Sequence, residues 1–353
     1  MIGIVLTNSL NTCPFIDKYL DVCKQLNAPY EVIMWDRTAD NTCYPSNFKV
    51  HKAPSELYQP KWKKIGDFFR FRHFLTKTIS EGRYDKLILL TSYAAVLCMD
   101  VLDRSYKGKY IFDFRDLTME NHTIFRSIVR HIVKNSAMTC ISSPGFAETL
   151  GLDDFIMAHN FRYKDIEEAN NWQIKPVSEP INLLHIGISR GESYNKKLAD
   201  IFGNDKRFAV NIIGSGNDTD TFLRYAEKFD NIHVEGTYNN ESKAGYIAQA
   251  DALLYYYPCS FNCDRALANK YYDSMIYKKP LIGNINTYSG RRLAEKGLGI
   301  SLDLDDPAFA DRIYQYLTEL NRKQFYEALQ TEMDCVLAED EEYLKAIKEF
   351  VKQ

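Results

Sequence analysis

Short apolar runs rich in β-branched residues alternate with longer stretches of helical periodicity along the first half of the chain. We expect strands at five of these runs, at 3–7, 30–35, 86–91, 110–114 and 138–142. Apolar residues recur with helical spacing between them, at 15–26, 65–80, 94–104 and 122–135. Strands that alternate with helices are typical of a parallel sheet with crossover helices, so this half predicts a doubly wound α/β domain.

The alternation stops at a polar stretch and then begins again. Residues 166–180 combine charged and amide side chains with two prolines, which indicates a linker. Further strands are expected at 181–187, 208–213, 231–235, 252–257, 280–283 and 299–302. The helices between them are expected at 194–202, 219–229, 242–249, 266–277 and 288–296, and from 307 onward the chain is predicted to be helical. We therefore expect one domain at 1–165, a second at 181–334, and a tail helix at about 335–353 that packs back on the first.

Composition and charge agree with two folded domains and argue against some partners. A chain of 353 residues with 45% hydrophobic and 26% charged residues is an ordinary globular mixture. The formal net charge of -3 offers no general field for nucleic acid, so no nucleic-acid partner is expected. The eight cysteines are scattered, several within apolar runs, and the first seven residues read as a strand, not a signal peptide. With no apolar stretch long enough to cross a bilayer, we expect a cytoplasmic protein.

The most informative segment runs from 250 to 282 and reads as strand, loop, helix and strand. Asn269, Lys270 and Asp273 fall on one face at the start of the helix, after Ala268. A helix N-terminus suits a diphosphate, and Lys270 would add a positive charge. Asp273 could accept hydrogen bonds from a ribose diol. The alternative is an amphipathic helix whose polar face is simply hydrated.

The strands before this segment end in small or charged residues. The strand at 181–187 ends in Gly187 and is followed by Arg190 and Lys196. The strand at 208–213 leads into Gly214 and Gly216, where the backbone can approach a ligand closely. A lone Gly-x-Gly is weak evidence, because turn glycines are common.

The ordered set of these pieces, from 181 to 302, resembles the donor-binding half of GT-B glycosyltransferases. It is most similar to the retaining family that includes capsular and exopolysaccharide enzymes. The segments 112–120, 140–146 and 159–160 resemble the acceptor domain of that family more loosely. The resemblance implies two Rossmann-like domains facing a cleft, which move a sugar from a nucleotide sugar to a surface polysaccharide or a lipid-linked saccharide, with retention.

The resemblance also implies roles for single residues. Arg190, together with Lys196 or Lys270, would neutralise the diphosphate as it leaves, so Arg190 and Lys270 are catalytic candidates. The backbone of Val234, Glu235 and Gly236 would hold the base, and Asp273 the ribose. The complete predicted donor site comprises Gly187, Arg190, Lys196, Gly214, Gly216, Val234, Glu235, Gly236, Ala268, Asn269, Lys270 and Asp273.

One position departs from the pattern of the family. Many relatives carry two glutamates eight positions apart; Asp273 stands at the second place, but Arg265 stands at the first, beside Asp264. The departure leaves the sugar open and allows a catalytically inactive scaffold of a polysaccharide-assembly complex. A nucleotide-sugar epimerase with the same two-domain plan is a further alternative, although no acid–base pair facing the sugar stands out.

Three acids of the first half cluster near the end of a predicted strand. They are Asp113, Asp116 and Glu120. Asp116 or Glu120 could serve as the base toward an acceptor hydroxyl, or orient His122. Asp116 could equally cap the next helix, and Arg115 could pair with an acid across the sheet. The departing phosphate could also take the proton.

Two basic segments of the first half contain aromatic or aliphatic residues at intervals, at 58–77 and 122–135. Such a surface could rest on an anionic bilayer at the inner face of the plasma membrane. The alternative is the hydrated face of a core helix. Asp303 and Asp305 read as a turn at a helix start, so no metal and no other cofactor is expected.

Overall fold

The protein is seen in a computed structural model that describes residues 1–353 apart from 11–12, 39–41, 56–60, 170–171, 174–175, 189–190, 217–218 and 240, and apart from the side chains of 61 and 62. The chain divides into two compact units. The first comprises Met1–His159 together with Ala338–Gln353, and the second comprises Asn160–Leu337.

The first unit is built on a seven-stranded parallel sheet with the order β3-β2-β1-β4-β5-β6-β7. Its strands are β1 (Ile2–Leu6), β2 (Tyr30–Asp36), β3 (Phe48–Lys52), β4 (Lys86–Leu90), β5 (Tyr110–Phe114), β6 (Met138–Ile141) and β7 (Ile156–Met157). Its helices before the tail are α1 (Ile16–Gln25), α2 (Lys61–Glu81), α3 (Ser92–Leu97), α4 (Met99–Ser105), α5 (Thr123–Asn135) and α6 (Pro144–Leu150). The five predicted strands are all present in this sheet.

The first unit differs from the sequence prediction in four elements, one of which is helix α6, which was not predicted. The strands β3 and β7 were not predicted, because β3 is a partly exposed strand without an apolar run and β7 has only two residues. The helix expected at 94–104 is divided into α3 and α4 at Cys98, whose φ of -119° lies outside the helical range.

The second unit repeats the same plan with six parallel strands in the order β10-β9-β8-β11-β12-β13. Its strands are β8 (Ile181–Ile186), β9 (Phe208–Ile213), β10 (Ile232–Glu235), β11 (Ala252–Tyr255), β12 (Leu281–Asn284) and β13 (Gly299–Leu302). Its helices are α7 (Tyr163–Ala169), α8 (Glu192–Phe202), α9 (Thr219–Ala226), α10 (Lys243–Gln249), α11 (Asn269–Ile276), α12 (Tyr288–Glu295) and α13 (Phe309–Thr318). The order in which the chain adds strands reverses beside β8, with β9 and β10 on one side and β11 to β13 on the other. Doubly wound folds bind ligands at such a point.

The alternation of side chains along β8 explains how this sheet is covered. Ile181 and Leu183 face a core made with α8, α9 and α13. Leu184 and Ile186 face the opposite core, to which α10, α11, α12 and the start of α14 (Arg322–Lys352) contribute. A parallel sheet covered by helices on both faces needs such nearly continuous apolar strands.

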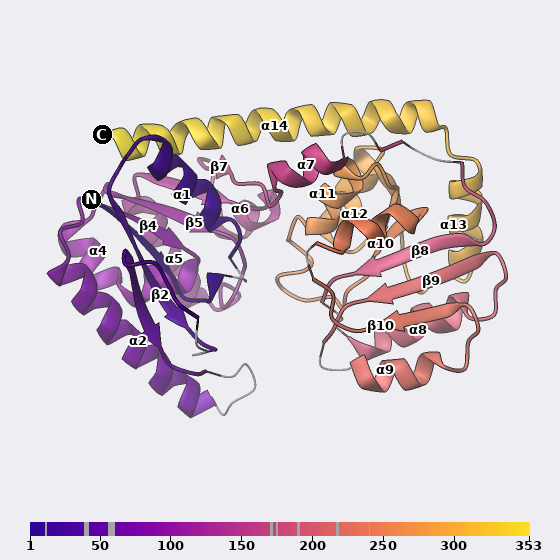
Figure 1. The fold of residues 1–353 in the computed structure, drawn as a ribbon, viewed down its shortest axis with the longest axis horizontal. Helices are drawn as coiled ribbons and strands as arrows, with labels where there is room; N and C mark the ends of the chain where they lie inside the picture. The colour runs from indigo at the N-terminus through magenta and orange to yellow at the C-terminus, as the bar shows by residue number, and fades with distance from the viewer. Residues whose placement is uncertain are drawn as a thin grey trace. The chain divides into compact units, whose positions relative to one another are not determined.

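Helix α14 belongs to both units (Figure 1). Within the second unit, Glu332 is 1% exposed and receives hydrogen bonds from Tyr271 and Arg292, both at 2.7 Å. Within the first unit, Tyr343, Ile347 and Phe350 join the core under β1 and α1. The division at 159/160 falls before the boundary expected at 165, and the region expected as a linker at 166–180 begins inside α7.

Candidate functional site

Three glycines stand in line at the carboxyl ends of adjacent strands in the second unit. The strand register pairs Ile186 with Ile213, and Ile213 with Glu235, so Gly187, Gly214 and Gly236 each follow an aligned strand end. A Cβ atom on Gly214 would stand 1.8 Å from the carbonyl oxygen of Gly187. Both residues have a φ that favours glycine, +134° at Gly187 and +133° at Gly214. The backbone is therefore bare and closely packed at this edge.

Lys270 lies next to this edge of the sheet. A Cβ atom on Gly187 would be 3.4 Å from the Lys270 Nζ and 3.5 Å from the Tyr257 hydroxyl. The Lys270 side chain is 9% exposed, and burial lowers the pKa of its ammonium group, an effect that Asp273 opposes. Its Nζ lies 3.7 Å from the Asp273 Oδ2. A buried ammonium beside bare backbone is suited to an anionic ligand.

Asp273 has a second cationic partner that sequence reasoning missed. Lys243, at the start of α10, donates a hydrogen bond of 2.5 Å to the Asp273 Oδ1. The Asp273 side chain is 4% exposed, and its Oδ2 has no hydrogen-bond partner among the residues that the structure describes. The carboxylate expected to bind a ribose diol is thus held between two lysines.

The polar surroundings of this cluster also include a neutral histidine. Burial, strengthened by the charge of Lys270 and opposed by a backbone interaction with Leu254, lowers the pKa of His185 to about 3. Its ring lies 5.3 Å from that of Tyr257. A histidine that stays neutral adds no positive charge beside Lys270.

The remaining predicted donor residues differ in their exposure and in their hydrogen-bond partners. Asn269 is exposed, and the backbone N–H of Ala268 donates to the Ser289 Oγ at 2.8 Å. The side chain of Glu235 accepts a hydrogen bond from Tyr246, whereas Val234 and Gly236 are partly buried on and after β10. The other glycine, Gly216, donates its N–H to Thr219 at the start of α9.

One of the other predicted phosphate ligands, Lys196, is not brought into the cluster. Lys196 pairs with Glu192 at 2.5 Å, one turn earlier on α8, and lies 4.8 Å from the centre of the Tyr225 ring. Arg190 lies outside the described residues. Of the predicted cations whose structure is described, Lys270 is the one beside Gly187.

Arg265, which stands where many relatives carry a glutamate, is held by its own loop. Its Nη1 donates to the carbonyl oxygen of Phe261 at 3.1 Å, and its guanidinium lies over the Phe261 ring. The neighbouring Asp264 accepts from the N–H of Ser260 at 3.1 Å. Both side chains thus contribute to the shape of the loop that precedes α11.

The acidic cluster predicted in the first unit separates into buried and exposed members. Asp113 forms a two-pronged pair with Arg115, with Nε–Oδ1 at 2.6 Å and Nη2–Oδ2 at 2.8 Å. The partner of Arg115 is therefore two residues earlier in the chain, on β5, and the alternative of a partner acid across the sheet is not what the structure shows. Glu120 is buried and accepts from the N–H groups of Thr118 and Met119 at 2.5 and 2.9 Å. Asp116 is exposed just after β5, which leaves it as the candidate base with solvent access.

Comparison with known proteins gives similarity of structure but not of sequence. No protein-family model matches the sequence, and no curated protein does. Among solved structures, HepE from Anabaena in complex with UDP has a TM-score of 0.66 at 11% identity, over 99% of this chain and 100% of that one. Sucrose-phosphate synthase from Thermosynechococcus elongatus has a TM-score of 0.61 at 10% identity, over 96% and 98% of the two chains. The chain has the GT-B fold. A putative UDP-N-acetylglucosamine 2-epimerase from Listeria monocytogenes is also similar, with a TM-score of 0.56 at 7% identity over 93% and 90% of the chains.

The first unit of this GT-B fold carries exposed apolar side chains on two of its helices and the turn before one of them. Ile65 and Phe69 on α2 are 57% and 66% exposed, Ile124 on α5 is 78% exposed, and Met119 is 42% exposed. An aromatic row joins the helices, since the Phe68 ring lies 5.2 Å from that of Tyr93, which lies 6.1 Å from that of Phe125.

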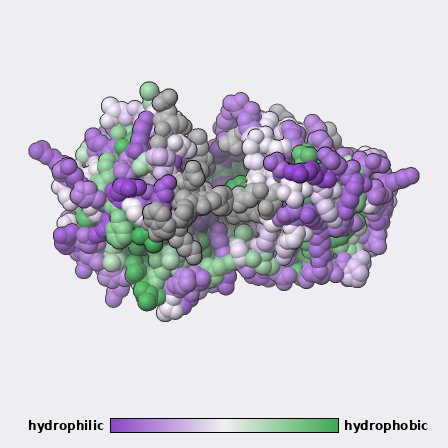
Figure 2. Space-filling model, turned by 90° about the horizontal axis from the view of Figure 1, so that it is seen from below, coloured by the Kyte–Doolittle hydropathy of each residue, from purple (hydrophilic) through white to green (hydrophobic). Residues whose placement is uncertain are grey.

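Hydrophobic surface is visible on the first unit among hydrophilic side chains in Figure 2. Exposed basic side chains among the described residues of the same helices include Lys63, Arg70, Lys77, Arg130 and Lys134. The inner faces of both helices, with Phe71 and Val129, are buried, so each helix is both a core helix and a carrier of this surface. Among the described helices, none combines the length and the hydropathy needed to span a membrane. Within the described part of the chain, no three His, Cys, Asp or Glu residues converge to form a metal site.

Proposed function

We propose that this protein is a glycosyltransferase whose second unit binds a nucleotide sugar and whose first unit binds the acceptor. The observation that carries the proposal is the edge formed by Gly187 and Gly214, with the buried ammonium of Lys270 beside it. Bare backbone and a buried cation at the carboxyl ends of parallel strands are suited to a diphosphate. The similarity to HepE, which was solved with UDP and with UDP-glucose, supports the same class of donor.

The proposed reaction needs little chemistry from the protein beyond charge stabilisation. The acceptor oxygen bonds to the anomeric carbon while the bond from that carbon to the phosphate oxygen breaks. The nucleoside diphosphate leaves with the electron pair, and Lys270 stabilises its growing charge. The hydroxyl proton passes to the departing phosphate or to Asp116. Retention, and a polysaccharide or lipid-linked acceptor, are proposed from the resemblance of the sequence to enzymes of that kind.

The donor proposal predicts a specific change in thermal stability. A nucleotide sugar or nucleoside diphosphate at a hundred times its dissociation constant should add about 2.7 kcal/mol to the free energy of unfolding. A thermal-shift screen across uridine, guanosine, adenosine, cytidine and thymidine diphosphates and their sugars measures this. Asp273→Ala should lose the shift, because it removes the proposed acceptor of the ribose hydroxyls. Asp230→Ala, which removes an exposed aspartate before β10, should keep it.

The possible outcomes distinguish a glycosyltransferase from a scaffold protein and from an epimerase. If no nucleotide raises the melting temperature of the parent, the donor site is wrong and a scaffold role takes its place, in line with Arg265 at the acidic position. If a nucleotide sugar binds but is converted to its epimer without an acceptor, the protein is an epimerase. Transfer of radiolabelled sugar to a lipid or saccharide acceptor supports the transferase.

We further propose that the exposed apolar and basic side chains of α2 and α5 form a surface that rests on an anionic membrane, where a lipid-linked acceptor is presented. Exposed Phe69 and Ile124, near exposed cations, combine apolar and electrostatic attraction. Phe69→Ser with Ile124→Ser should lower binding to phosphatidylglycerol vesicles about tenfold or more, since each buried apolar side chain contributes roughly 1.5–3 kcal/mol. Vesicle co-sedimentation measures it, with Tyr326→Ser, an exposed aromatic of the second unit, as the control. Equal sedimentation of parent and double variant would refute the surface.

A further inference from the structure

The lysine that pairs with Asp273 from α10 has no role in the site as predicted from the sequence. Lys243 and Lys270 contact opposite oxygens of one carboxylate, at 2.5 Å and 3.7 Å. Their side chains are 16% and 9% exposed, so both charges are largely removed from water. The charge of Lys243 also helps to lower the pKa of Lys270, to which burial contributes most.

The charges of this cluster do not balance. Two lysines share one carboxylate, and His185 next to Lys270 is neutral, with its pKa lowered to about 3 mainly by burial. Lys243 and Asp273 also act electrostatically on the hydroxyl of Tyr238, but burial raises its pKa, so it supplies no negative charge. Excess positive charge in a poorly hydrated place is costly unless an anion compensates it. A ligand that brings negative charge relieves this cost on binding.

We propose that Lys243 is a specificity-determining residue of the donor site, which binds the diphosphate and so selects nucleoside diphosphates over nucleosides. This inference rests on the proposed donor site. On binding, the diphosphate takes the place of Asp273 as the partner of Lys243. The Asp273 Oδ1 is then open to the ribose diol, while Lys270 keeps the carboxylate paired on its other side. One lysine thus couples recognition of the phosphate to recognition of the ribose.

The test compares a charged ligand with its uncharged counterpart. The probes are uridine diphosphate and uridine, or the diphosphate and nucleoside of another base if the thermal-shift screen selects it. Lys243→Gln should weaken the diphosphate about 10- to 100-fold, the loss expected for a charge-assisted contact. The nucleoside should change less than about threefold, because it carries no phosphate. Isothermal titration calorimetry measures both.

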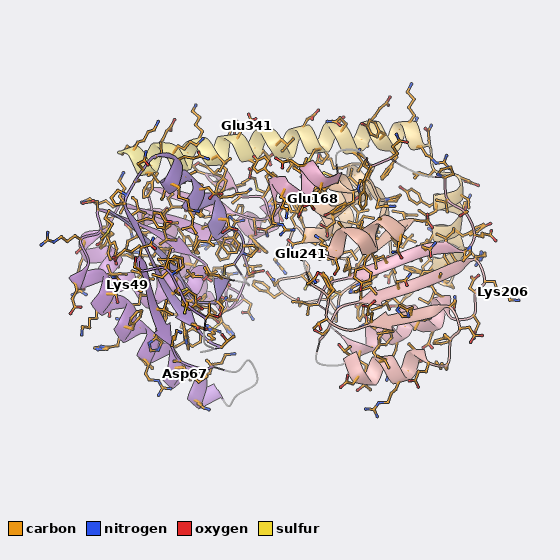
Figure 3. The ribbon with its side chains drawn as sticks, in the orientation of Figure 1. Lys49, Asp67, Glu168, Lys206, Glu241 and Glu341 are labelled. Carbon is orange, nitrogen blue, oxygen red and sulfur yellow. The ribbon has the colours of Figure 1, made fainter. Side chains whose placement is uncertain are left out.

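Matched controls separate a lost charge from a lost contact. Lys206→Gln removes one exposed lysine before β9 and should leave both affinities unchanged. Lys206 is well separated from Glu241, which stands two residues before Lys243 (Figure 3). Lys243→Arg keeps the positive charge and should hold the diphosphate affinity within about threefold of the parent. An equal loss for diphosphate and nucleoside in Lys243→Gln would overturn the proposal.

A double variant distinguishes contact with the ligand from a purely structural role. If Lys243 only neutralises Asp273, then Asp273→Asn should restore the diphosphate affinity of Lys243→Gln to that of Asp273→Asn alone. If Lys243 contacts the diphosphate, the double variant should stay about tenfold or more weaker than Asp273→Asn. Failure of the parent to bind any diphosphate overturns the donor site itself, which is a different result from unchanged binding by Lys243→Gln.

Discussion

Replacing Arg115 by methionine should lower the stability of the first unit by about 3–5 kcal/mol, because it leaves a buried carboxylate without its cation. Asp113 and Arg115 are 0% and 3% exposed. The guanidinium also donates to the carbonyl oxygen of Ala158 at 2.7 Å and to the hydroxyl of Tyr343 at 3.1 Å. Tyr19 donates to Asp113 at 2.7 Å, so the network joins β5, α1 and α14. Although burial acts to lower the pKa of Arg115, the charge of Asp113 raises it above its usual value.

Native-state hydrogen exchange measures this loss unit by unit. Amides of β1, β4 and β5 should lose protection in Arg115→Met, and those of β8 and β9 should keep it. The control is Arg207→Met in the second unit, which breaks partly exposed pairs with Asp205 and Asp311 and should cost about 1 kcal/mol. Adding Asp113→Leu to Arg115→Met should recover part of the loss, since no unpaired charge then remains buried. Unchanged protection in the first unit would show that the pair contributes nothing.

This network shows why catalytic acids were hard to assign from the sequence. Asp113, Asp116 and Glu120 lie within eight residues, at the end of one strand and just after it, which is a common position for catalytic groups. Which of them faces solvent depends on partners distant in sequence, such as Tyr19 and Tyr343. The carboxylate of Glu120 accepts hydrogen bonds from the backbone N–H groups of the two residues before it. The spacing of residues in the sequence does not predict this.

The fold was more accessible to prediction than the site. Buried parallel strands are continuous apolar runs, as in Leu87–Leu90 of β4 or Leu281–Ile282 of β12, and eleven such runs were recognisable. The two strands that were missed, β3 and β7, lie at the edges of their sheet, where one neighbour is lacking and less apolar surface is needed. The break between α3 and α4 at Cys98 has no signal from glycine or proline.

The sequence predicted the part of the site that follows from the topology of the sheet. Residues that follow parallel strands meet at one edge, so Gly187 and Gly214 are brought together, and Lys270 approaches them from α11. The pairing of Lys243 with Asp273 joins residues 30 positions apart on two different helices. Nothing in the local pattern of either helix indicates that pair. Lys196 shows the opposite case, since a partner one turn away on its own helix is sufficient to bind it.

Gly214→Ala should both destabilise the second unit and abolish nucleotide binding. The new methyl group would stand 1.8 Å from the carbonyl oxygen of Gly187, and that oxygen belongs to backbone, which does not move aside as a side chain can. Alanine is also strained at the φ of +133° found at Gly214. The N–H of Gly214 bonds to Glu235 and the N–H of Gly187 to Ile213, at 3.0 and 2.9 Å, so a shift would disturb three strands. Together these effects should cost roughly 3 kcal/mol or more.

Gly245→Ala is the matched control, because it makes the same chemical change where space is open. Gly245 lies in α10, and nothing lies within 4 Å of a Cβ atom built on it. Alanine there should stabilise the helix by up to about 1 kcal/mol. Thermal unfolding with and without the selected diphosphate measures stability and binding in the same experiment. If Gly214→Ala unfolds like the parent and still binds the diphosphate, the backbone at this edge can shift to make room for the methyl group. The close approach of β8 and β9 would then not be needed for donor binding, and Lys270 and Asp273 would have to hold the nucleotide without it.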